Sequence, residues 1–202
     1  MPRCAVIRQA LPDERSGVIA TVSAAFAEDP AWAFIFDNEY ERLAAHFAGA
    51  LFDVRVVSQN VWVTDDLAVV AMWDPPGKSD AAPAYADSVW THYRAIAGDS
   101  AFERLTRYND AVACASTAEP HWYLGVLATD PERQREGLAT AVLKPILGKA
   151  DQLGIACCLE TSTAENRRFY ERRGFTQATE IVLPGGPPSW WLRRAPTAMT
   201  AR

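Results

Sequence analysis

The sequence predicts an α/β fold in which helices flank a β-sheet. Two apolar runs typical of strands, at 122–129 and 155–160, enclose an amphipathic helix at 137–153. Strands joined by a helix in this order pair in parallel, because the crossover returns the chain to the same end of the sheet. The 202 residues, 49% of them apolar, suit one core, and no repeat or low-complexity linker divides 1–202, so we expect a single domain.

The other helices and strands follow from the spacing of apolar residues. This spacing predicts helices at 14–27, 39–57, 101–113 and 164–173, and around 85–93. Apolar runs bounded by turn residues predict strands at 5–9, 61–63, 67–73, 175–183 and 189–193. Within the helix at 137–153, Pro145 is expected to introduce a kink, and Gly154 is expected to end the helix.

Charge and composition argue against several classes of function. The net charge is −5, whereas nucleic-acid-binding proteins usually carry a basic face. The sequence has no run of about 18 apolar residues that could span a membrane. Residues 1–10 lack the pattern of a signal peptide. We therefore expect a cytoplasmic protein that binds neither nucleic acid nor membrane.

The cysteines and histidines indicate no metal site. The sequence contains no CxxC and no Cys/His pair at zinc spacing. Cys157 and Cys158 are adjacent in a predicted strand, so their side chains should point to opposite faces as small buried hydrophobic residues. The histidines have no carboxylate or serine at a motif spacing, so we expect them in surface or structural roles; they are His46, His92 and His121.

The polar loop at 130–136 joins the first of the two parallel strands to the helix that begins near Gly137. A helix N-terminus presents unpaired backbone N–H groups and a partial positive charge, which suits a phosphate or pyrophosphate. Gly137 and Ala139 would allow close approach of an anion, and Arg133 and Arg135 would add charge. Without further signals, an ordinary strand-to-helix turn explains the same residues. The loop is neither a dinucleotide fingerprint nor a Walker loop.

The segment at 160–175 carries two groups capable of proton transfer. Glu160 ends an apolar strand, where a carboxylate is unusual, and Tyr170 follows Phe169 on a short predicted helix. Taken singly, such a glutamate most often faces solvent, and such a tyrosine most often packs in a core with its hydroxyl satisfied. The two residues indicate a function only when they are considered together with the polar loop at 130–136.

Together the segments LATDPERQREGLAT (127–140) and ETSTAENRRFYERRGF (160–175) resemble the GNAT superfamily of N-acetyltransferases. The resemblance covers 122–175, and the order and spacing of its motifs agree with the predicted strands and helices. A weaker resemblance, carried by AAFAEDP, VWV, LAVVAMW and GPPSWWL, extends to the puromycin N-acetyltransferase branch of that superfamily. Pro145 inside the helix also fits that branch.

The resemblance implies a mixed central sheet that splits in a V between the parallel strands at 122–129 and 155–160, with acetyl-CoA entering the V. Glycine is common in the family at 135 and 139, where this chain has arginine and alanine. Asn166 would contact the CoA arm, and Tyr170 would stand near the thioester sulfur. Pantetheine would pair with backbone at Leu127, Ala128 and Thr129, and the pyrophosphate would rest on backbone amides of Arg135, Glu136, Gly137, Leu138, Ala139 and Thr140.

The resemblance and the residues together predict transfer of an acetyl group from acetyl-CoA to a primary amine of a small molecule. An alkyl amine with a pKa of about 10 is mostly protonated at neutral pH, so a base must first remove a proton. Glu160 would be that base, directly or through water, and Tyr170 would protonate the departing thiolate. We expect direct attack without a metal or a covalent enzyme intermediate.

The acceptor is less constrained by the sequence. Acidic residues at Glu28, Asp29 and Asp37 could attract a cation, and aromatic residues at Trp32, Phe34 and Phe36 could supply apolar contact. Puromycin is one candidate, although the aromatic residues could equally form core. Two alternatives remain: a protein N-terminal or lysine N-acetyltransferase, and a non-catalytic CoA-binding regulatory module. Either a monomer or a homodimer is compatible with the sequence.

Overall fold

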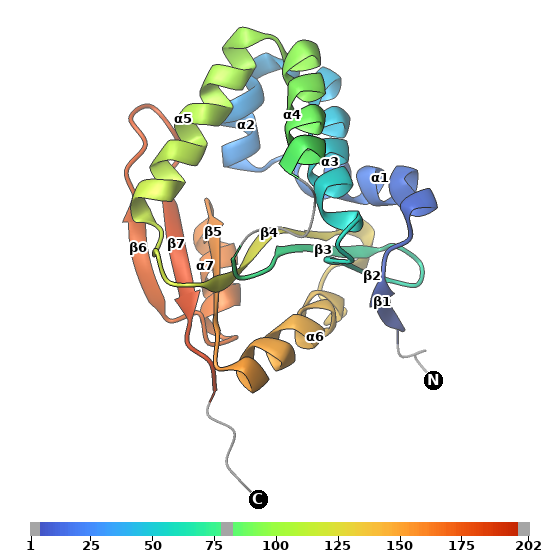
Figure 1. Cartoon of the computed structure of the whole chain (residues 1–202), viewed down its shortest axis with the longest axis vertical. Helices are drawn as coiled ribbons and strands as arrows, with labels where there is room; N and C mark the ends of the chain where they lie inside the picture. Colours follow the sequence, from blue (N-terminus) through green and yellow to red (C-terminus); the bar gives the residue numbers. More distant parts are fainter. Residues whose placement is uncertain (1–4, 78–82, 198–202) are drawn as a thin grey trace, which may run out of the picture.

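The structure is a computed structural model that describes residues 5–77 and 83–197 (Figure 1). Its seven-stranded sheet has the order β1-β2-β3-β4-β5-β7-β6. Only the β4–β5 pair is parallel among the described strands, so the sheet is mixed, as predicted. The strands are β1 (Ile7–Gln9), β2 (Val61–Thr64), β3 (Val69–Asp74), β4 (His121–Thr129), β5 (Ala156–Thr161), β6 (Gln177–Ile181) and β7 (Ser189–Arg194).

Seven α-helices occupy the described residues, and one of them was not predicted. The unpredicted helix is α2, where the sequence indicated only an aromatic segment after Pro30; the Asp29 side chain caps it by accepting hydrogen bonds from the amides of Ala31 and Trp32. The helix α6 continues through Pro145. The helices are α1 (Arg15–Ala25), α2 (Pro30–Phe36), α3 (Tyr40–Val56), α4 (Pro83–Ala97), α5 (Asp99–Ala115), α6 (Leu138–Leu153) and α7 (Ala164–Glu171).

Taken one at a time, the helices in the described parts of the chain are all too short or too polar to cross a bilayer. The bent pair Pro12–Ala25 and Pro30–Val56, with 103° between its halves, passes the same test of length and composition when its two parts are joined. In the structure the second of these segments buries residues such as Leu43 and Phe47 in the core.

The helices cover both faces of the sheet. In Figure 1, α1 to α5 lie above the sheet and α6 lies below it. Val70, Met72 and Val126 pack toward the upper helices, whereas Val69 and Ala71 pack toward α6. The adjacent Cys157 and Cys158 are both fully buried and belong to separate clusters, which confirms that they point to opposite faces. Cys114 is exposed, and Cys4 lies outside the described residues.

The strands β4 and β5 pair over only part of their lengths. The parallel register begins at His121 with Ala156 and ends at Leu124 with Leu159. From there β4 continues along β3 alone, as far as the pairing of Thr129 with Val69. The sheet therefore opens between β4 and β5 beyond Leu124, which confirms the predicted V.

A β-bulge in β4 lies where the two strands part. Met72 of β3 pairs with Val126, but the next residue, Trp73, pairs with Leu124, so Gly125 is an extra residue in β4. The bulge reverses the alternation of side chains along the strand. As a result, Leu124 packs against the α6 side, while Tyr123 and Val126, three residues apart, both lie on the side of the upper helices.

An ion pair joins the end of α6 to the last strand. Asp151 accepts hydrogen bonds from Arg194 Nη1 at 2.7 Å and Nη2 at 2.8 Å, and from the amide of Thr197 at 2.7 Å. The pair is largely buried, and the hydrogen bonds with Arg194 hold the pKa of Asp151 below its ordinary value. Charge-assisted pairs of this geometry are stronger than exposed ones.

We expect Asp151→Asn to lower the free energy of unfolding at pH 7 by about 1–3 kcal/mol, because it weakens hydrogen bonds to a charged group. Since the folded-state pKa is depressed, the stabilisation is present above the unfolded pKa of about 3.9 and is lost as the pH falls through the folded pKa. Urea unfolding at pH 7 and at pH 3 measures the difference. Asp99→Asn, which removes the exposed pair with Arg94, should change stability by less than about 1 kcal/mol. An equal loss for Asp151→Asn at both pH values would contradict this assignment.

Candidate active site

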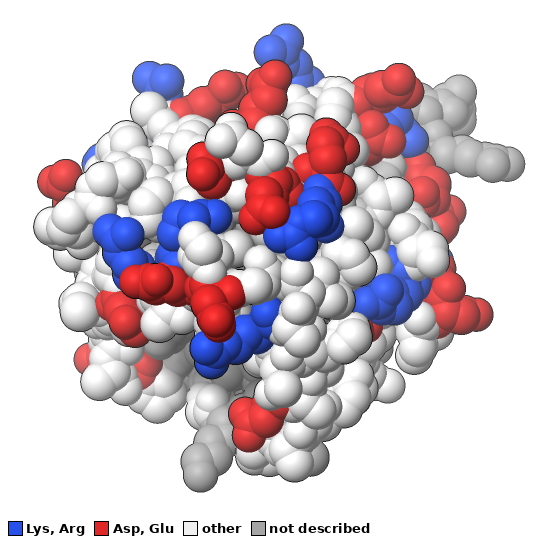
Figure 2. Space-filling model, turned by 90° about the horizontal axis from the view of Figure 1, so that it is seen from above, with Lys and Arg blue, Asp and Glu red and all other residues white. Residues whose placement is uncertain are grey.

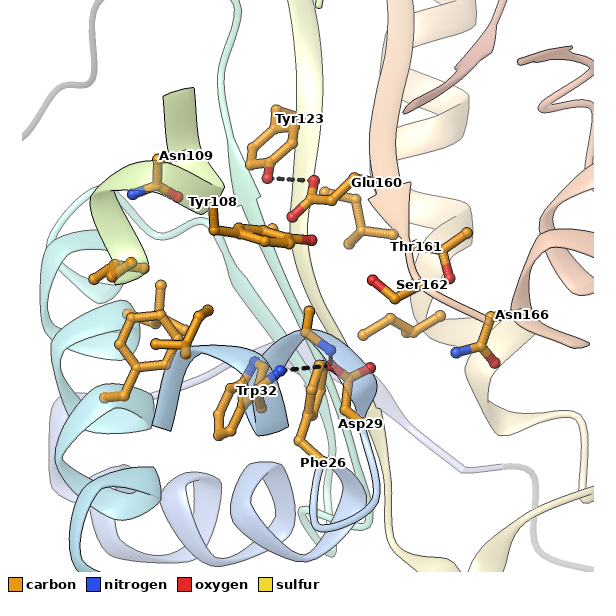
Figure 3. Close-up of a pocket in the computed structure, with 18 of the residues that line it drawn as sticks. Phe26, Asp29, Trp32, Tyr108, Asn109, Tyr123, Glu160, Thr161, Ser162 and Asn166 are labelled. Atoms are coloured by element: carbon orange, nitrogen blue, oxygen red, sulfur yellow. Dashed lines mark hydrogen bonds between the residues drawn. The ribbon is translucent and has the colours of Figure 1, made fainter. Parts of the chain in front are cut away.

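A cavity of about 240 Å³ lies between the upper helices and the point where β4 and β5 part (Figure 3). One side of the cavity is aromatic, formed by rings in a chain of contacts that we call the aromatic wall: Phe26, Trp32, Phe47 and Trp90. Polar groups line the remainder, among them Asp29, Arg55, Tyr123, Glu160 and Asn166. The cavity thus combines apolar surface with a few polar groups, as small-molecule sites do.

Glu160 enters the cavity from the end of β5, where β4 no longer covers the strand. Its carboxylate accepts a hydrogen bond of 2.5 Å from the hydroxyl of Tyr123 (Figure 3). Burial raises the pKa of Glu160 to about 7, although the Tyr123 hydrogen bond and the charge of Arg55 oppose the rise. A carboxylate with this pKa can gain or release a proton near neutral pH.

The sequence analysis did not single out Tyr123, which lies on β4 opposite Cys158 of β5. Glu160 is two residues beyond Cys158 and therefore points to the same side, within diagonal reach of Tyr123. The Tyr123 ring stacks on Trp191, with centroids 5.8 Å apart and an interplanar angle of 12°. The predicted parallel pairing of the two strands indicated that residues of 122–129 and 155–160 would be neighbours. Only the register of the strands shows that Tyr123 and Glu160 are the residues that meet.

Tyr170 lies on α7, a helix capped by the Thr163 hydroxyl, which accepts from the amide of Asn166 at 3.1 Å. The ring of Tyr170 is buried edge-on between Phe169 and Phe175, with centroid separations of 5.2 and 5.8 Å, and it lines the cavity. Burial and the negative charge of Glu160 raise the pKa of Tyr170 well above its ordinary value. Its hydroxyl therefore keeps its proton at neutral pH.

The loop before α6 has the backbone geometry of an anion cradle. Gly137, the residue that precedes α6, has φ +80°, and a Cβ added there would meet no atom within 4 Å. Arg135 has φ +67°, in the left-handed region that glycine adopts most easily. The backbone at 135 therefore has a conformation that glycine adopts readily, and arginine adopts it in this chain. Arg133 pairs with Glu136 of the same loop at 2.9 Å and with Asp66 of the β2–β3 turn at 2.7 Å. Arg133 therefore joins the loop to that turn.

The structure brings the two predicted segments together. Arg173, just beyond α7, donates from Nε to the hydroxyl of Thr140 in the first turn of α6 at 3.0 Å. The Arg173 guanidinium also lies 3.4 Å from the centroid of the Phe169 ring. The start of α6 and the helix that carries Tyr170 and Asn166 are therefore directly connected.

The residues predicted to hold pantetheine lie on the part of β4 that has parted from β5. Leu127 lines the cavity, and Ala128 and Thr129 pair with β3 on the opposite edge. No register pair with β5 extends to these residues, so one edge of β4 offers backbone groups here. Asn166 lines the same cavity (Figure 3).

The structure corrects two of the acceptor contacts expected from the sequence. Asp29 and Trp32 line the cavity, but Glu28 is exposed outside it. Phe36 is 0% exposed and packs in the core against Trp32 and Phe47, so it lies behind these rings and does not line the cavity. Burial raises the pKa of Asp29 above its ordinary value, while its capping hydrogen bonds oppose the rise.

Arg55 and Tyr108 also line the cavity, although no motif in the sequence indicated them. Arg55 follows Leu51 by one helical turn on the inward face of α3, so a charged residue continuing an apolar stripe was the available signal. Tyr108 comes from α5, whose inward face could not be assigned before α5 was placed above β5 and β7. Neither His46, His92 nor His121 lines the cavity, and no three metal-binding side chains gather within the described ranges 5–77 and 83–197.

Comparisons with known proteins agree with this geometry. Residues 83–175 match the model of the Acetyltransferase (GNAT) family. An uncharacterized N-acetyltransferase of Schizosaccharomyces pombe is 24% identical over 176 residues, which cover 81% of this chain and 71% of the relative.

Solved structures with a similar fold include the histone acetyltransferase HPA2 and related acetyltransferase of Corynebacterium glutamicum, at 21% identity and a TM-score of 0.66, with 98% of this chain and 99% of that chain covered. The Drosophila melanogaster polyamine N-acetyltransferase has 12% identity and a TM-score of 0.64, covering 95% and 100%. An arylalkylamine N-acetyltransferase 7 of the mosquito Aedes aegypti has 14% identity and a TM-score of 0.65, covering 95% and 87%.

The matched segment, the split sheet and the named N-acetyltransferases make the chain similar to acetyltransferases of the GNAT family, whose members use acetyl-CoA. The split sheet, the left-handed Gly137 and the free edge of β4 fit that co-substrate. The puromycin N-acetyltransferase branch is not distinguished by these similarities and stays a hypothesis.

We expect Gly137→Val to weaken acetyl-CoA binding by roughly tenfold or more, because a side chain at φ +80° costs about 1–2 kcal/mol and also fills the space over the loop. Calorimetry with acetyl-CoA in the presence of a metal chelator measures the affinity and also tests the expectation that no metal is needed. Gly148→Val, at an exposed position further along α6, is the matched control and should bind normally. Unchanged affinity in Gly137→Val would exclude the loop as the pyrophosphate site.

Proposed function

We propose that this acetyltransferase moves the acetyl group of acetyl-CoA to a primary amine of a small molecule, with residues 1–202 acting as one domain. The observation that carries the proposal is the cavity at the opening of the V, because it places Glu160 and Tyr170 around one space beside the free edge of β4. The three solved structures above include enzymes named for polyamine and arylalkylamine substrates, which supports a small amine as acceptor.

The cavity suits a small apolar amine better than a peptide. Its volume of about 240 Å³ favours a small molecule over a chain segment, and the aromatic wall provides apolar contact. An amine that approaches Glu160 and Asp29 meets carboxylates across from aromatic faces, an arrangement that favours a cation. A puromycin-like aminonucleoside is one candidate within this class.

In the proposed mechanism, Glu160 removes a proton from the acceptor ammonium, directly or through a water. The amine then attacks the thioester carbonyl carbon, so a C–N bond forms and the C–S bond breaks. Backbone N–H groups of β4 near Leu127 to Thr129 stabilise the oxyanion. Tyr170 donates its proton to the departing sulfur and regains one from the nitrogen, which loses its second proton as it becomes an amide. The products are the acetamide, free CoA and the proton held by Glu160.

A protein acceptor is the second candidate, since one structural neighbour is named as a histone acetyltransferase. Recognition of a basic histone tail favours a continuous acidic surface. Figure 2 shows acidic and basic side chains interspersed over the face seen from above. This mixed surface, together with the small cavity, favours the small-molecule proposal. The non-catalytic alternative is disfavoured because both proposed proton-transfer groups lie at the cavity.

We expect Tyr170→Phe to lower turnover roughly 10²- to 10⁴-fold, because it removes only the proton donor. The assay measures CoA thiol release with puromycin, aminoglycosides, polyamines, amino acids and N-terminal peptides, followed by mass analysis of the products. Binding of acetyl-CoA should be nearly unchanged.

The matched control is Tyr93→Phe, which deletes a buried hydroxyl behind the aromatic wall. Tyr93 does not line the cavity, so the variant should keep full activity. Wild-type turnover in Tyr170→Phe would assign the tyrosine to packing. Much faster turnover of peptides than of every small amine would replace the small-molecule proposal with the protein acceptor.

The pH dependence tests Glu160 as the base. With a pKa of about 7, Glu160 is mostly protonated below neutral pH, so kcat/KM should rise with pH through about 7. Glu160→Gln should lose most activity at neutral pH and less at alkaline pH, where more amine is free. Tyr123→Phe removes a hydrogen bond that lowers the pKa of Glu160, so the rise should move to higher pH. A rise at the wild-type pH in Tyr123→Phe, or a uniform loss at every pH in Glu160→Gln, would count against this role.

A further inference from the structure

Arg173 is a half-buried arginine that joins the start of α6 to the end of α7. Its Nη1 donates to the carbonyl oxygen of Phe169 at 2.5 Å, and its guanidinium stacks on the Phe169 ring, 3.4 Å from the centroid. Both Nε, at 3.0 Å, and Nη2 donate to the hydroxyl of Thr140. One side chain therefore contacts the first turn of α6 and the residue that precedes Tyr170.

The partners of Arg173 are all neutral. They are a carbonyl oxygen, a hydroxyl and an aromatic ring, and no carboxylate within 5–77 or 83–197 forms an ion pair with it. Burial and the charge of Arg172 lower the pKa of Arg173, so its surroundings disfavour the cation. Thr140 lies in the first turn of α6, where the helix dipole adds a partial positive charge. A bound anion would compensate these charges.

Arg133, one of the arginines that the sequence indicated for an anion, has a different environment. It pairs with Asp66 at 2.7 Å and with Glu136 at 2.9 Å. One arginine and two carboxylates leave a net negative charge, which repels a phosphate. Arg173 has no such acidic partner, and it reaches the start of the same helix. The positive charge that a pyrophosphate needs is therefore better supplied by Arg173 than by Arg133.

Arg173 also acts on the proposed general acid. Its amide donates to the carbonyl oxygen of Tyr170 at 2.8 Å, and the Phe169 ring that its guanidinium covers packs edge-on against the Tyr170 ring at 5.2 Å. Burial and the charge of Glu160 raise the pKa of Tyr170, and the charge of Arg173 opposes that rise. Displacement of the guanidinium would therefore change both the position of Tyr170 and its ability to donate a proton.

We propose that Arg173 is a positioning residue that links donor binding to the general acid: it interacts with the pyrophosphate of acetyl-CoA beside Thr140 and, held there, fixes Phe169 and Tyr170. The inference rests on the proposed function, which assigns the pyrophosphate to the start of α6 and the acid to Tyr170. It adds a connection between them. Binding energy from the diphosphate end of the donor then supports the chemistry at its thioester end.

A purely structural role is the alternative. Arg173 would then hold α7 against α6 whether or not a donor is bound, and loss of its side chain would lower turnover with every donor by the same factor. In the proposed role, the loss is larger when the donor carries its pyrophosphate. Donors of different length therefore separate the two roles.

The experiment compares acetyl-CoA with S-acetylpantetheine, which keeps the thioester and the pantetheine arm but lacks the pyrophosphate and the nucleoside. The ratio of kcat/KM in wild type to kcat/KM in a variant is measured for each donor with one amine. We expect Arg173→Met to lower kcat/KM roughly 10- to 100-fold more with acetyl-CoA than with acetylpantetheine. Arg172→Met, which removes an adjacent exposed arginine, should change neither ratio. Equal losses with both donors would overturn the inference.

Binding provides a readout that does not need turnover. Calorimetry should show a loss of affinity of roughly tenfold or more in Arg173→Met for CoA, and an equal loss for dephospho-CoA, which keeps the pyrophosphate and lacks the 3′-phosphate. Arg173→Lys keeps the charge without the planar fork, so its affinity should lie between those of wild type and Arg173→Met. Thermal unfolding checks that each variant is folded. Unchanged affinity for both ligands, or a loss for CoA alone, would contradict the proposed contact.

A double variant tests the link to the acid. We expect Arg173→Met to lower kcat at saturating acetyl-CoA by roughly tenfold in wild type, but not further in Tyr170→Phe, where the acid is already absent. A full additional loss in Tyr170→Phe would contradict the positioning role. Absence of turnover with every amine in wild type would refute the proposed function, whereas calorimetry with CoA and dephospho-CoA would still decide whether Arg173 meets the pyrophosphate.

Discussion

The strand β4 lies between β3 and β5 and pairs with them over different parts of its length. Along β3 it is paired from Tyr123 to Thr129, but along β5 only from His121 to Leu124. The extra residue at Gly125 rotates the rest of β4, and past that point its edge is left without a ladder partner. An unpaired strand edge inside a protein is costly unless another group supplies hydrogen bonds, and pantetheine is the group proposed here. The cavity, the approach to Glu160 and the space for Arg55 all depend on this departure.

The neighbours of the polar groups at the opening of the sheet set the pKa values of these groups. Burial alone would raise the pKa of Glu160 further, but the Tyr123 hydroxyl and the Arg55 charge stabilise its ionised form. Tyr170 experiences burial and the Glu160 charge together, and both effects keep its proton in place. The opening of the sheet therefore holds one group that is partly ionised near neutral pH and can accept a proton, and another that stays protonated and can donate one, a division of roles that acid–base catalysis needs.

Much of the fold could be predicted from local patterns. The helix at 137–153, the strands on either side of it and their parallel pairing followed from apolar spacing, because each pattern extends over many residues. The helix α2 was missed because its seven residues are too few for a periodic signal, and its start depends on the Asp29 cap. For the site, Glu160 and Tyr170 stood out through the resemblance of their segments, and the structure places both at one cavity.

The residues that give the cavity its character were decided by contacts between distant segments. Phe36 follows Trp32 by one helical turn and contacts its ring, but Phe36 is enclosed in the core and only Trp32 reaches the cavity. Tyr123 acquired its bond to Glu160 through strand register, 37 residues along the chain. Arg55 met Gly125 only because α3 packs over the bulge. The sequence by itself determined the elements and the motif residues, since those depend on neighbours along the chain. Tertiary structure alone decided which side chains share the cavity, because a one-residue shift in a strand or a 100° step in a helix changes the face on which a side chain lies.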